Sequence, residues 1–306
     1  MNKQMRFSTL LVCALLIVPK VPPRLQVTPV ALDPVVPQAE IVGRAVCRGS
    51  TWLLTKSADL IRLNHDSRTS TTQRASDVRP DDSFWGLACL EDGNLWTLAT
   101  GHVLARMTTN GTIVERVVMA MPQLEVFGVQ DRLVFLGLPI VPDRPVLSVA
   151  SRGSPGTVRP WLGLVGRASF GSGPSFPTNL VDCGISFASR LPCWFADRSR
   201  ISISDGTIAR EVALPWLDES GVNRAAPIRD AALMPDGSMW VLAASSAATL
   251  DGRRVSQKLS HVTPSGVEQE SVPLTPAARL IAWVDTTGCV LLSVTGNLLR
   301  VSNRGG

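Results

Sequence analysis

The chain has 306 residues, of which 45% are hydrophobic, 18% charged and 5% aromatic. The apolar fraction excludes a largely disordered chain, and the length is sufficient for a large core. The formal net charge is +5, but Lys3, Arg6 and Lys20 lie in an N-terminal segment without acidic residues, and without them 27 basic residues stand against 25 acidic ones. The basic balance therefore does not indicate a nucleic-acid partner.

Residues 1–23 have the pattern of an export signal. Lys3 and Arg6 precede the apolar run 7–18, which is shorter than the roughly 20 residues that a spanning helix needs. No pair of small residues that would mark a cleavage site follows this run closely. We therefore expect a periplasmic or secreted protein, with anchoring to the inner membrane by residues 7–18 as the alternative.

Residues 84–119 contain four short apolar or alternating runs, which predict four antiparallel strands. The turns between them contain Asp92-Gly93 and Asn110-Gly111, which supply the positive φ that hairpin turns require. The predicted strands are Phe84–Leu90, Asn94–Leu98, His102–Met107 and Thr112–Met119.

Similar units recur along the chain, with starts 40 to 55 residues apart. Four antiparallel strands at this spacing are typical of propeller blades, whereas a pair of β-sandwiches explains the regular Asp-Gly-x-x-Trp spacing less well. The sequence thus predicts an all-β fold, a six-bladed β-propeller of four-stranded antiparallel blades that occupies 24–306 as a single domain. The predicted blades are 41–77, 84–120, 124–165, 179–215, 229–274 and 279–306. In the fifth unit, a longer insertion separates Leu242 from Val255.

The last unit, 279–306, contains only three predicted strands. An open blade would leave unpaired backbone groups on its outer strand. The segment 24–36 is rich in Val and Pro and has no other predicted role, and proline is tolerated on an edge strand. We expect this segment to pair with the strand around Leu298–Val301 and to close the ring.

Two stretches carry a family resemblance. The motif Glu-Asp-Gly-Asn-Leu-Trp-Thr-Leu at 91–98 and Pro-Asp-Gly-Ser-Met-Trp-Val-Leu at 235–242 resembles blades of the streptogramin-lyase and NHL-type propellers. The likeness is good over these two blades and loose over the other four. It implies a six- or seven-bladed fold, but these residues build turns and inter-blade core in enzymes and binding propellers alike, so it does not imply a function.

The resemblance to streptogramin lyases raises the question of a catalytic histidine with bound magnesium near the central cavity. None of the three histidines, His65, His102 and His261, falls on a predicted innermost strand. We expect them in exposed loops and do not expect a histidine metal site.

Lactonase-type propellers instead bind a divalent cation through oxygen ligands from the ends of inner strands. Glu125, Asp182 and Asp230 lie near the starts of three consecutive predicted inner strands, with Arg229 and Arg279 nearby. Three carboxylates converging on the channel mouth would suit Mg²⁺ or Ca²⁺. The alternative is a set of channel-mouth charges paired with the arginines.

Four of the eight tryptophans share one place in a predicted second strand and are expected to pack between blades: Trp52, Trp96, Trp194 and Trp240. Trp85 begins an inner strand, and Trp161 lies in the Gly- and Pro-rich stretch 153–177. Exceptional loops often carry function, so Trp85 and Trp161 are candidate binding residues.

An exported protein could pair four of the five cysteines that follow Cys13. Cys183 and Cys193 fall on two predicted strands joined by a hairpin turn, which makes them candidates for a disulfide bond. The alternative is that the cysteines are buried free thiols.

Together these patterns favour an exported, non-catalytic binding module that recognises a protein, peptide or glycan through loops on one face. We expect a monomer without a cofactor and without a nucleic-acid ligand. The alternative is a metal-dependent lyase or lactonase-type propeller enzyme with a divalent cation in the axial channel.

Overall fold

The structure is a computed structural model. It describes residues 25–100, 102–120, 123–129, 132–137, 146–151, 153–156, 159–160, 193–197, 200–204, 209–216, 228–234, 236–249 and 252–303. The predicted leader 1–23, Trp161, Asp182 and Cys183 lie outside these residues. Within the described part, no helix is long and apolar enough to cross a membrane.

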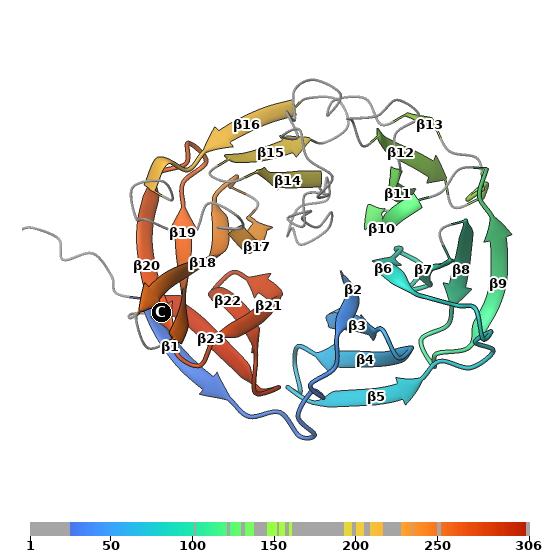
Figure 1. Cartoon of the computed structure of the whole chain (residues 1–306), viewed down its shortest axis with the longest axis horizontal. Coiled ribbons are helices and arrows are strands. Elements are labelled where there is room, and N and C mark those ends of the chain that lie inside the picture. The colour runs from blue at the N-terminus through green and yellow to red at the C-terminus, as the bar shows by residue number, and fades with distance from the viewer. Residues whose placement is uncertain are drawn as a thin grey trace, which may run out of the picture.

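Apart from the helical residues 215–216, the elements formed by the described residues are β-strands, which form six sheets arranged around a ring (Figure 1). The first two sheets contain β2 (Ile41–Cys47), β3 (Ser50–Thr55), β4 (Asp59–Asn64) and β5 (Ser70–Arg74), then β6 (Trp85–Cys89), β7 (Leu95–Thr100), β8 (Val103–Met107) and β9 (Ile113–Val118). The next two contain β10 (Gln123–Val129), β11 (Arg132–Gly137), β12 (Val146–Ser151) and β13 (Arg159–Pro160), then β14 (Cys193–Asp197), β15 (Arg200–Ser204) and β16 (Ala209–Ala213).

The fifth sheet contains β17 (Ile228–Leu233), β18 (Met239–Thr249), β19 (Gly252–Val262) and β20 (Glu268–Leu274). The sixth contains β21 (Ala278–Asp285), β22 (Gly288–Ser293), β23 (Leu298–Asn303) and β1 (Leu25–Val30). Each sheet is antiparallel and, apart from β1, ordered as in the chain, which is the organisation of a propeller blade. The predicted all-β propeller fold is confirmed.

The first turn of several blades depends on glycine. In the Asp-Gly turns of the second and fifth sheets, Gly93 and Gly237 have φ values of 84° and 82°. A side chain at either position would be strained, because positive φ is costly for other residues. These are the turns that the Asp-Gly pattern of the sequence predicts.

The second-strand tryptophans pack between neighbouring blades. Trp52, Trp96 and Trp240 have exposed fractions of 5% or less. Trp96 shares a cluster with Val126 and Phe135 of the next sheet. The interpretation of these residues as inter-blade core is confirmed for these three, while the side chain of Trp194 lies outside the described part.

The ring closes as predicted, with one strand from the beginning of the chain. β1 pairs antiparallel with β23 over six residue pairs, from Leu25 opposite Asn303 to Val30 opposite Leu298. Pro29 is tolerated because β1 is the outer strand of its sheet. The last blade is therefore built from both ends of the chain (Figure 1).

The segment between β1 and β2 fastens the sixth sheet to the first. Leu32 and Val36 are buried, and the Val36 N–H donates to the carbonyl of Gly296 at 3.0 Å. On the other side, the Ser70 hydroxyl donates to the carbonyl of Pro34 at 2.5 Å. Residues 31–39 thus add contacts to both sides of the junction that β1 closes.

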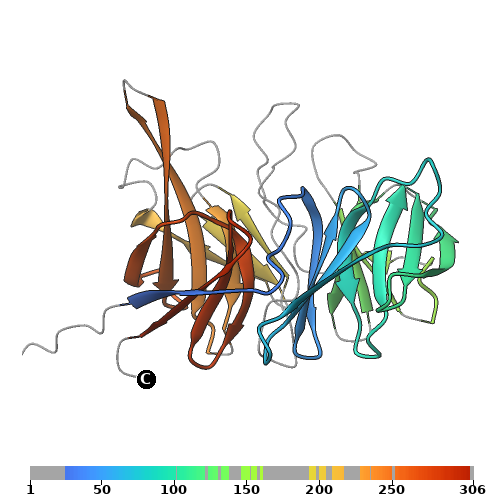
Figure 2. The ribbon, with the colours of Figure 1, turned by 90° about the horizontal axis from the view of Figure 1, so that it is seen from below.

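The fifth sheet differs from the prediction at one place. The stretch between Leu242 and Val255, interpreted as an insertion, continues the hairpin, since β18 and β19 each have 11 residues. The hairpin rises above the rest of the ring (Figure 2). The small residues of Ala243–Thr249 do not alternate between apolar and polar, so the pattern gave no strand signal there.

Ring closure makes a testable prediction. Val27 of β1 is half-buried against the core between the fifth and sixth sheets, whereas the next residue, Thr28, is exposed. Val27→Asp places a carboxylate against this core and is expected to lower the free energy of unfolding by about 2 kcal/mol. Thr28→Asp, the matched control, should change it by less than about 0.5 kcal/mol. Urea unfolding of the full chain measures both, and equal stabilities would contradict closure by β1.

Candidate functional site

The topology defines two ends of the ring. All innermost strands run in the same direction, so β6, β17 and β21 begin at one end, which we call the mouth face. The turns that join the first two strands of each blade, such as Asp92–Asn94 and Asp236–Ser238, lie at the opposite end, which we call the turn face. Each blade's second strand ends at the mouth face.

An irregularity recurs at the mouth face. In each of five innermost strands, the pairing register shifts near the start of the strand. The shifts fall between Ile41 and Gly43, Trp85 and Ala88, Gln123 and Glu125, Ile228 and Asp230, and Ala278 and Leu280. β-Bulges re-aim side chains and are over-represented next to functional sites.

Two of the predicted candidates are exposed at these irregularities. Trp85 has an exposed fraction of 42%, while Trp52, Trp96, Trp240 and Trp283 are buried. Arg229, the extra residue of the shift in β17, is exposed as well. The mouth face therefore presents an accessible indole and an accessible guanidinium near the starts of two innermost strands.

Arg279 occupies the equivalent place in β21, but its guanidinium is bound to backbone carbonyls. Its guanidinium donates to the carbonyl of Pro37 at 3.0 Å and to the carbonyl of Ala39. It is half-buried, and burial lowers its pKa from the ordinary value for arginine. Arg279 thus holds the segment that leads into β2.

Asp230 lies in the wall of the ring and is saturated with hydrogen bonds. Its carboxylate accepts from Arg44 Nη1 at 2.5 Å and Nη2 at 3.0 Å, and from the backbone N–H groups of Ile281 at 2.6 Å and Ala231 at 2.9 Å. Arg44 Nη1 also donates to the Ile281 carbonyl at 2.5 Å. These contacts connect β17, β21 and β2, the innermost strands of three consecutive blades.

Of the three carboxylates predicted to hold a cation, the structure describes the side chain of only one, Asp230. Asp182 lies outside the described residues, and Glu125 lies on β10 without a described side chain. Asp230 uses both oxygens to accept hydrogen bonds from Arg44, which is not one of the two arginines, Arg229 and Arg279, expected near these carboxylates. Among the described residues, no group of three or more His, Cys, Asp or Glu side chains could hold a metal ion.

The histidines depart from the sequence prediction. His102 is exposed as expected, but His65 stacks on Trp283 with ring centroids 4.2 Å apart, and its Nε2 lies 2.9 Å from Thr51 Oγ1. Because the Thr51 hydroxyl donates to the Ala282 carbonyl, Nε2 carries the proton and donates to Thr51. Burial lowers the pKa of His65 to about 4, although Asp66 and Asp285 oppose this shift.

His261 has a related environment in the fifth sheet. Its ring lies 4.7 Å from that of Trp240, and Nε2 lies 3.2 Å from the Ser238 hydroxyl at the turn face. Burial also lowers its pKa, with Asp236 acting in the opposite direction. The expectation that all three histidines are exposed is therefore wrong for His65 and His261, because each packs on a tryptophan.

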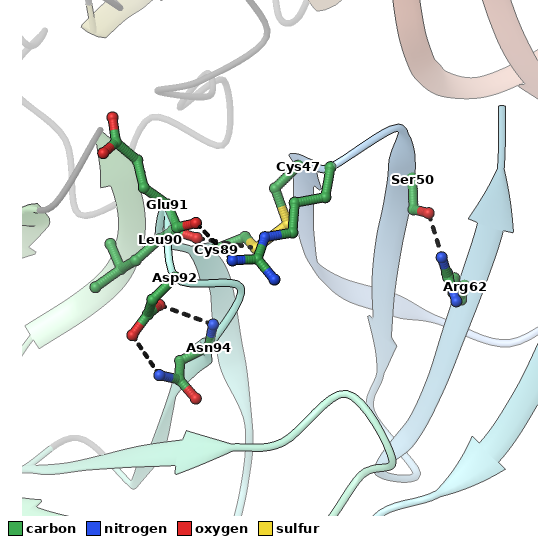
Figure 3. The surroundings of a disulfide bond; sticks show 9 residues. Cys47, Ser50, Arg62, Cys89, Leu90, Glu91, Asp92 and Asn94 are labelled. Atoms are coloured by element: carbon green, nitrogen blue, oxygen red, sulfur yellow. Dashed lines mark hydrogen bonds between the residues drawn. A yellow bond between two sulfur atoms is a disulfide. The ribbon is translucent and has the colours of Figure 1, made fainter.

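A disulfide bond occurs where the sequence analysis did not place one. Cys47 and Cys89, the last residues of β2 and β6, are joined with Cα atoms 6.1 Å apart (Figure 3). Nearby, Arg48 donates to the Glu91 carbonyl at 2.9 Å, and Asp92 accepts from the Asn94 N–H at 2.9 Å. Both cysteines end the first strand of their blade, and this shared position is the signal that could have paired them.

The remaining cysteine whose thiol is described is buried. Cys289 lies in the core between the fifth and sixth sheets, and burial raises its pKa well above the ordinary value for a thiol. The interpretation as a buried free thiol is confirmed for Cys289. The Cys183–Cys193 pairing stays a prediction, because Cys183 lies outside the described residues.

No protein-family model matches the chain, and no curated protein sequence matches it. Solved structures do match its fold. Virginiamycin B lyase from Staphylococcus aureus is similar with a TM-score of 0.52 and 12% identity, over 92% of this chain and 100% of the lyase. A member of the DUF4221 family from Bacteroides vulgatus is similar with a TM-score of 0.55 and 9% identity, over 93% and 97% of the two chains.

A structure of YCF48 bound to a D1 peptide is also similar, with a TM-score of 0.52 and 11% identity, over 93% of this chain and 86% of YCF48. At these identities the likeness shows the fold alone. The chain has a β-propeller fold like that of the streptogramin lyases, as the resemblance of its blade motifs implies.

The contact between Arg44 and Asp230 predicts a large stability effect. The exposed fractions of the two side chains are 10% and 6%, so removing one charge leaves the other buried. Asp230→Asn is expected to lower the free energy of unfolding by about 3–5 kcal/mol. The control Glu40→Gln, which breaks the exposed pair with Lys56, should cost less than about 1 kcal/mol.

Adding Arg44→Met to an Asp230→Leu chain should recover part of the loss, because it removes the buried guanidinium whose carboxylate partner is gone. Urea unfolding of the four variants and of the unchanged protein measures these effects. Equal effects of Asp230→Asn and Glu40→Gln would contradict a buried tie between the inner strands.

The lowered pKa of His65 predicts a pH dependence. The unfolded chain takes up this proton near pH 6.5 and the folded chain only near pH 4, so stability present above pH 6.5 is lost as the pH falls toward 4. His65→Phe keeps a ring against Trp283 and removes this titration. Its Tm should fall less between pH 7 and pH 4.5 than that of the unchanged protein. Parallel profiles for His65→Phe and the unchanged protein would show that His65 titrates normally.

Proposed function

We propose that the chain is an exported, non-catalytic binding propeller that takes an extended segment of another protein at its mouth face. The observation that carries the proposal is the exposure of the Trp85 side chain. This side chain is exposed at the start of an innermost strand, whereas the other tryptophans with described side chains are buried or half-buried. Large aromatic side chains are enriched among the anchor residues of protein interfaces.

The environment of Asp230 argues for binding rather than catalysis. A carboxylate that accepts two N–H groups from Arg44 and two from the backbone is a structural tie rather than a free base or ligand. The half-buried histidines His65 and His261 pack on tryptophans away from the starts of the innermost strands. The described side chains at the mouth face thus suit recognition better than acid–base chemistry.

The YCF48 structure supports a peptide as the ligand class, since it is a propeller of similar fold with a bound peptide. The disulfide bond between Cys47 and Cys89 supports export, because such bonds persist in oxidising compartments. The predicted leader 1–23 agrees with this compartment.

The test is selection of ligands from a display library of random linear peptides on the immobilised full chain. Trp85→Ala is expected to weaken binding of the selected peptides about 30-fold, as for an interface anchor worth about 2 kcal/mol. Val267→Ala is the matched control, because Val267 is an apolar residue with 60% exposure beside a turn at the opposite end of the ring. Its affinity should be unchanged.

Metal analysis of the same protein separates the two hypotheses. The proposal predicts peptide binding that is indifferent to EDTA. One tightly held divalent cation per chain, together with peptides whose affinity is unchanged by Trp85→Ala, would instead favour the metal-dependent lyase or lactonase-type enzyme.

A further inference from the structure

The most unusual feature of the mouth face is the outer part of the β18–β19 hairpin. β18 and β19 pair over eleven consecutive residue pairs, from Met239 opposite Val262 to Thr249 opposite Gly252. β17 pairs with β18 only as far as Ala243, and β20 pairs with β19 only as far as Gln257. The remainder, Ala244–Thr249 with Gly252–Ser256, is a two-stranded ribbon that we call the arm (Figure 2).

The arm extends about 20 Å beyond the last residue pair of β17, because a strand rises about 3.3 Å per residue. No other strand of the described part pairs with either of its edges. Two-stranded ribbons are marginally stable in water unless another element packs on them. A partner that completes the sheet would stabilise the arm.

The pairing pattern shows which backbone groups line the arm's inner edge, the one on the side of β17. Ser238 accepts a hydrogen bond from Met234, so its backbone faces that side. The N–H and carbonyl groups of successive residues point to opposite sides of a strand. Those of every second residue after Ser238 therefore point toward the side of β17, namely Trp240, Leu242, Ala244, Ser246 and Ala248. Ser246 and Ala248 lie beyond the end of β17, and each presents an N–H and a carbonyl there.

The sequence explains why β17 stops short of the arm. The residue before Ile228 is a proline, which has no N–H to donate to the next position of the ladder. An added strand would continue the line of β17 beyond Ile228, the first residue that pairs with β18 in the described part.

The inner-edge strand lacks the proline and the charged residues with which many open edges are protected. From Ala244 to Thr249 the strand contains only Ala, Ser and Thr, without proline or charge. By contrast, β1 contains Pro29, β20 contains Pro273, and the other strand of the arm contains Arg253 and Arg254. Unprotected edges pair readily with extended chains.

The charge of the arm indicates which kind of peptide segment would pair with its inner edge. Arg253 and Arg254 lie opposite Ala248 and Ala247 in the register of the ribbon. The sequence from 244 to 256 contains one acidic residue, Asp251, against these two arginines. Arg229, exposed at the base, adds a third positive charge. Complementary charge therefore favours an acidic ligand.

We infer that the inner edge of the arm binds an extended acidic segment of a partner protein as an added β-strand. This inference rests on the proposed function and specifies its ligand class and its mode of recognition. The main-chain groups of Ser246 and Ala248 provide the hydrogen bonds, and the arginines provide the selection for acidic residues.

The experiment uses the full chain and two fluorescein-labelled ten-residue probes, one alternating Thr and Glu and one alternating Thr and Lys. At low salt, the Thr–Glu peptide should bind at least tenfold more tightly than the Thr–Lys peptide. Ser246→Pro removes an inner-edge N–H and should weaken this binding at least tenfold. Val255→Pro is the matched control, because Val255 lies opposite Ser246 and its N–H faces the outer edge. It should leave the affinity unchanged.

A second variant covers the case in which Ser246→Pro disturbs the fold, which its Tm would reveal. Arg253→Glu combined with Arg254→Glu leaves the backbone groups in place and should reverse the preference toward the Thr–Lys peptide. Equal affinities for the two peptides, or binding that none of these changes affects, would overturn the inference. So would a dimer in sedimentation that Ser246→Pro dissociates, because a second copy would then occupy the edge.

The outcomes also separate this inference from the proposed function. Library-selected peptides that lose affinity with Trp85→Ala but not with Ser246→Pro would preserve the binding propeller and overturn strand addition. Failure to obtain any peptide that depends on Trp85, together with failure of the Thr–Glu probe, would overturn both.

Discussion

The fold depends on the antiparallel pairing of β1 with β23. A ring of sheets holds its shape only if the last blade is joined to the first, and here six residue pairs connect positions separated by nearly the whole chain. The pairing gives the sixth sheet its outer strand and leads the chain across to the first sheet. Each blade buries its faces against its neighbours, so this one contact maintains packing around the circle.

Further ties act on the inner side of the ring. Arg44 and Asp230 connect the innermost strands of the fifth, sixth and first blades, and the Cys47–Cys89 bond continues this connection to the second blade. Gly43 contributes by being small, because a Cβ there would lie 2.5 Å from the backbone of Gly86. The side chains that hold the inner strands together are thus separate from those exposed at the mouth face, Trp85 and Arg229, which leaves these two available for recognition.

Much of this architecture could be predicted from the sequence because its signals are local. Asp-Gly pairs mark turns such as those at Gly93 and Gly237, and the tryptophans at fixed places in the second strands indicate inter-blade core. The missing strand of the last blade predicted closure by the N-terminal segment. Trp85, which begins an inner strand and departs from the regular tryptophan pattern, is exposed, while its role in binding stays a prediction.

The contacts that escaped prediction connect different blades. Arg44 reaches Asp230 past an intervening blade, and Cys47 pairs with the next blade rather than within its own. His65 packs on Trp283 across the junction that closes the ring. Such pairings depend on how sheets are rotated against one another, which turn residues and hydrophobic alternation do not encode. The arm was not predicted as strand for another reason, since Ala and Ser have a low preference for β-strands.

The central claim is that the mouth face is the binding surface of this propeller. Hydrogen–deuterium exchange of the full chain, with and without a peptide selected from the display library, tests it most directly. The account predicts slower exchange confined to the start of β6, the start of β17 and the outer half of β18. Protection at the turn face, around Asp92–Asn94 and Asp236–Ser238, with no change at the mouth face would contradict it.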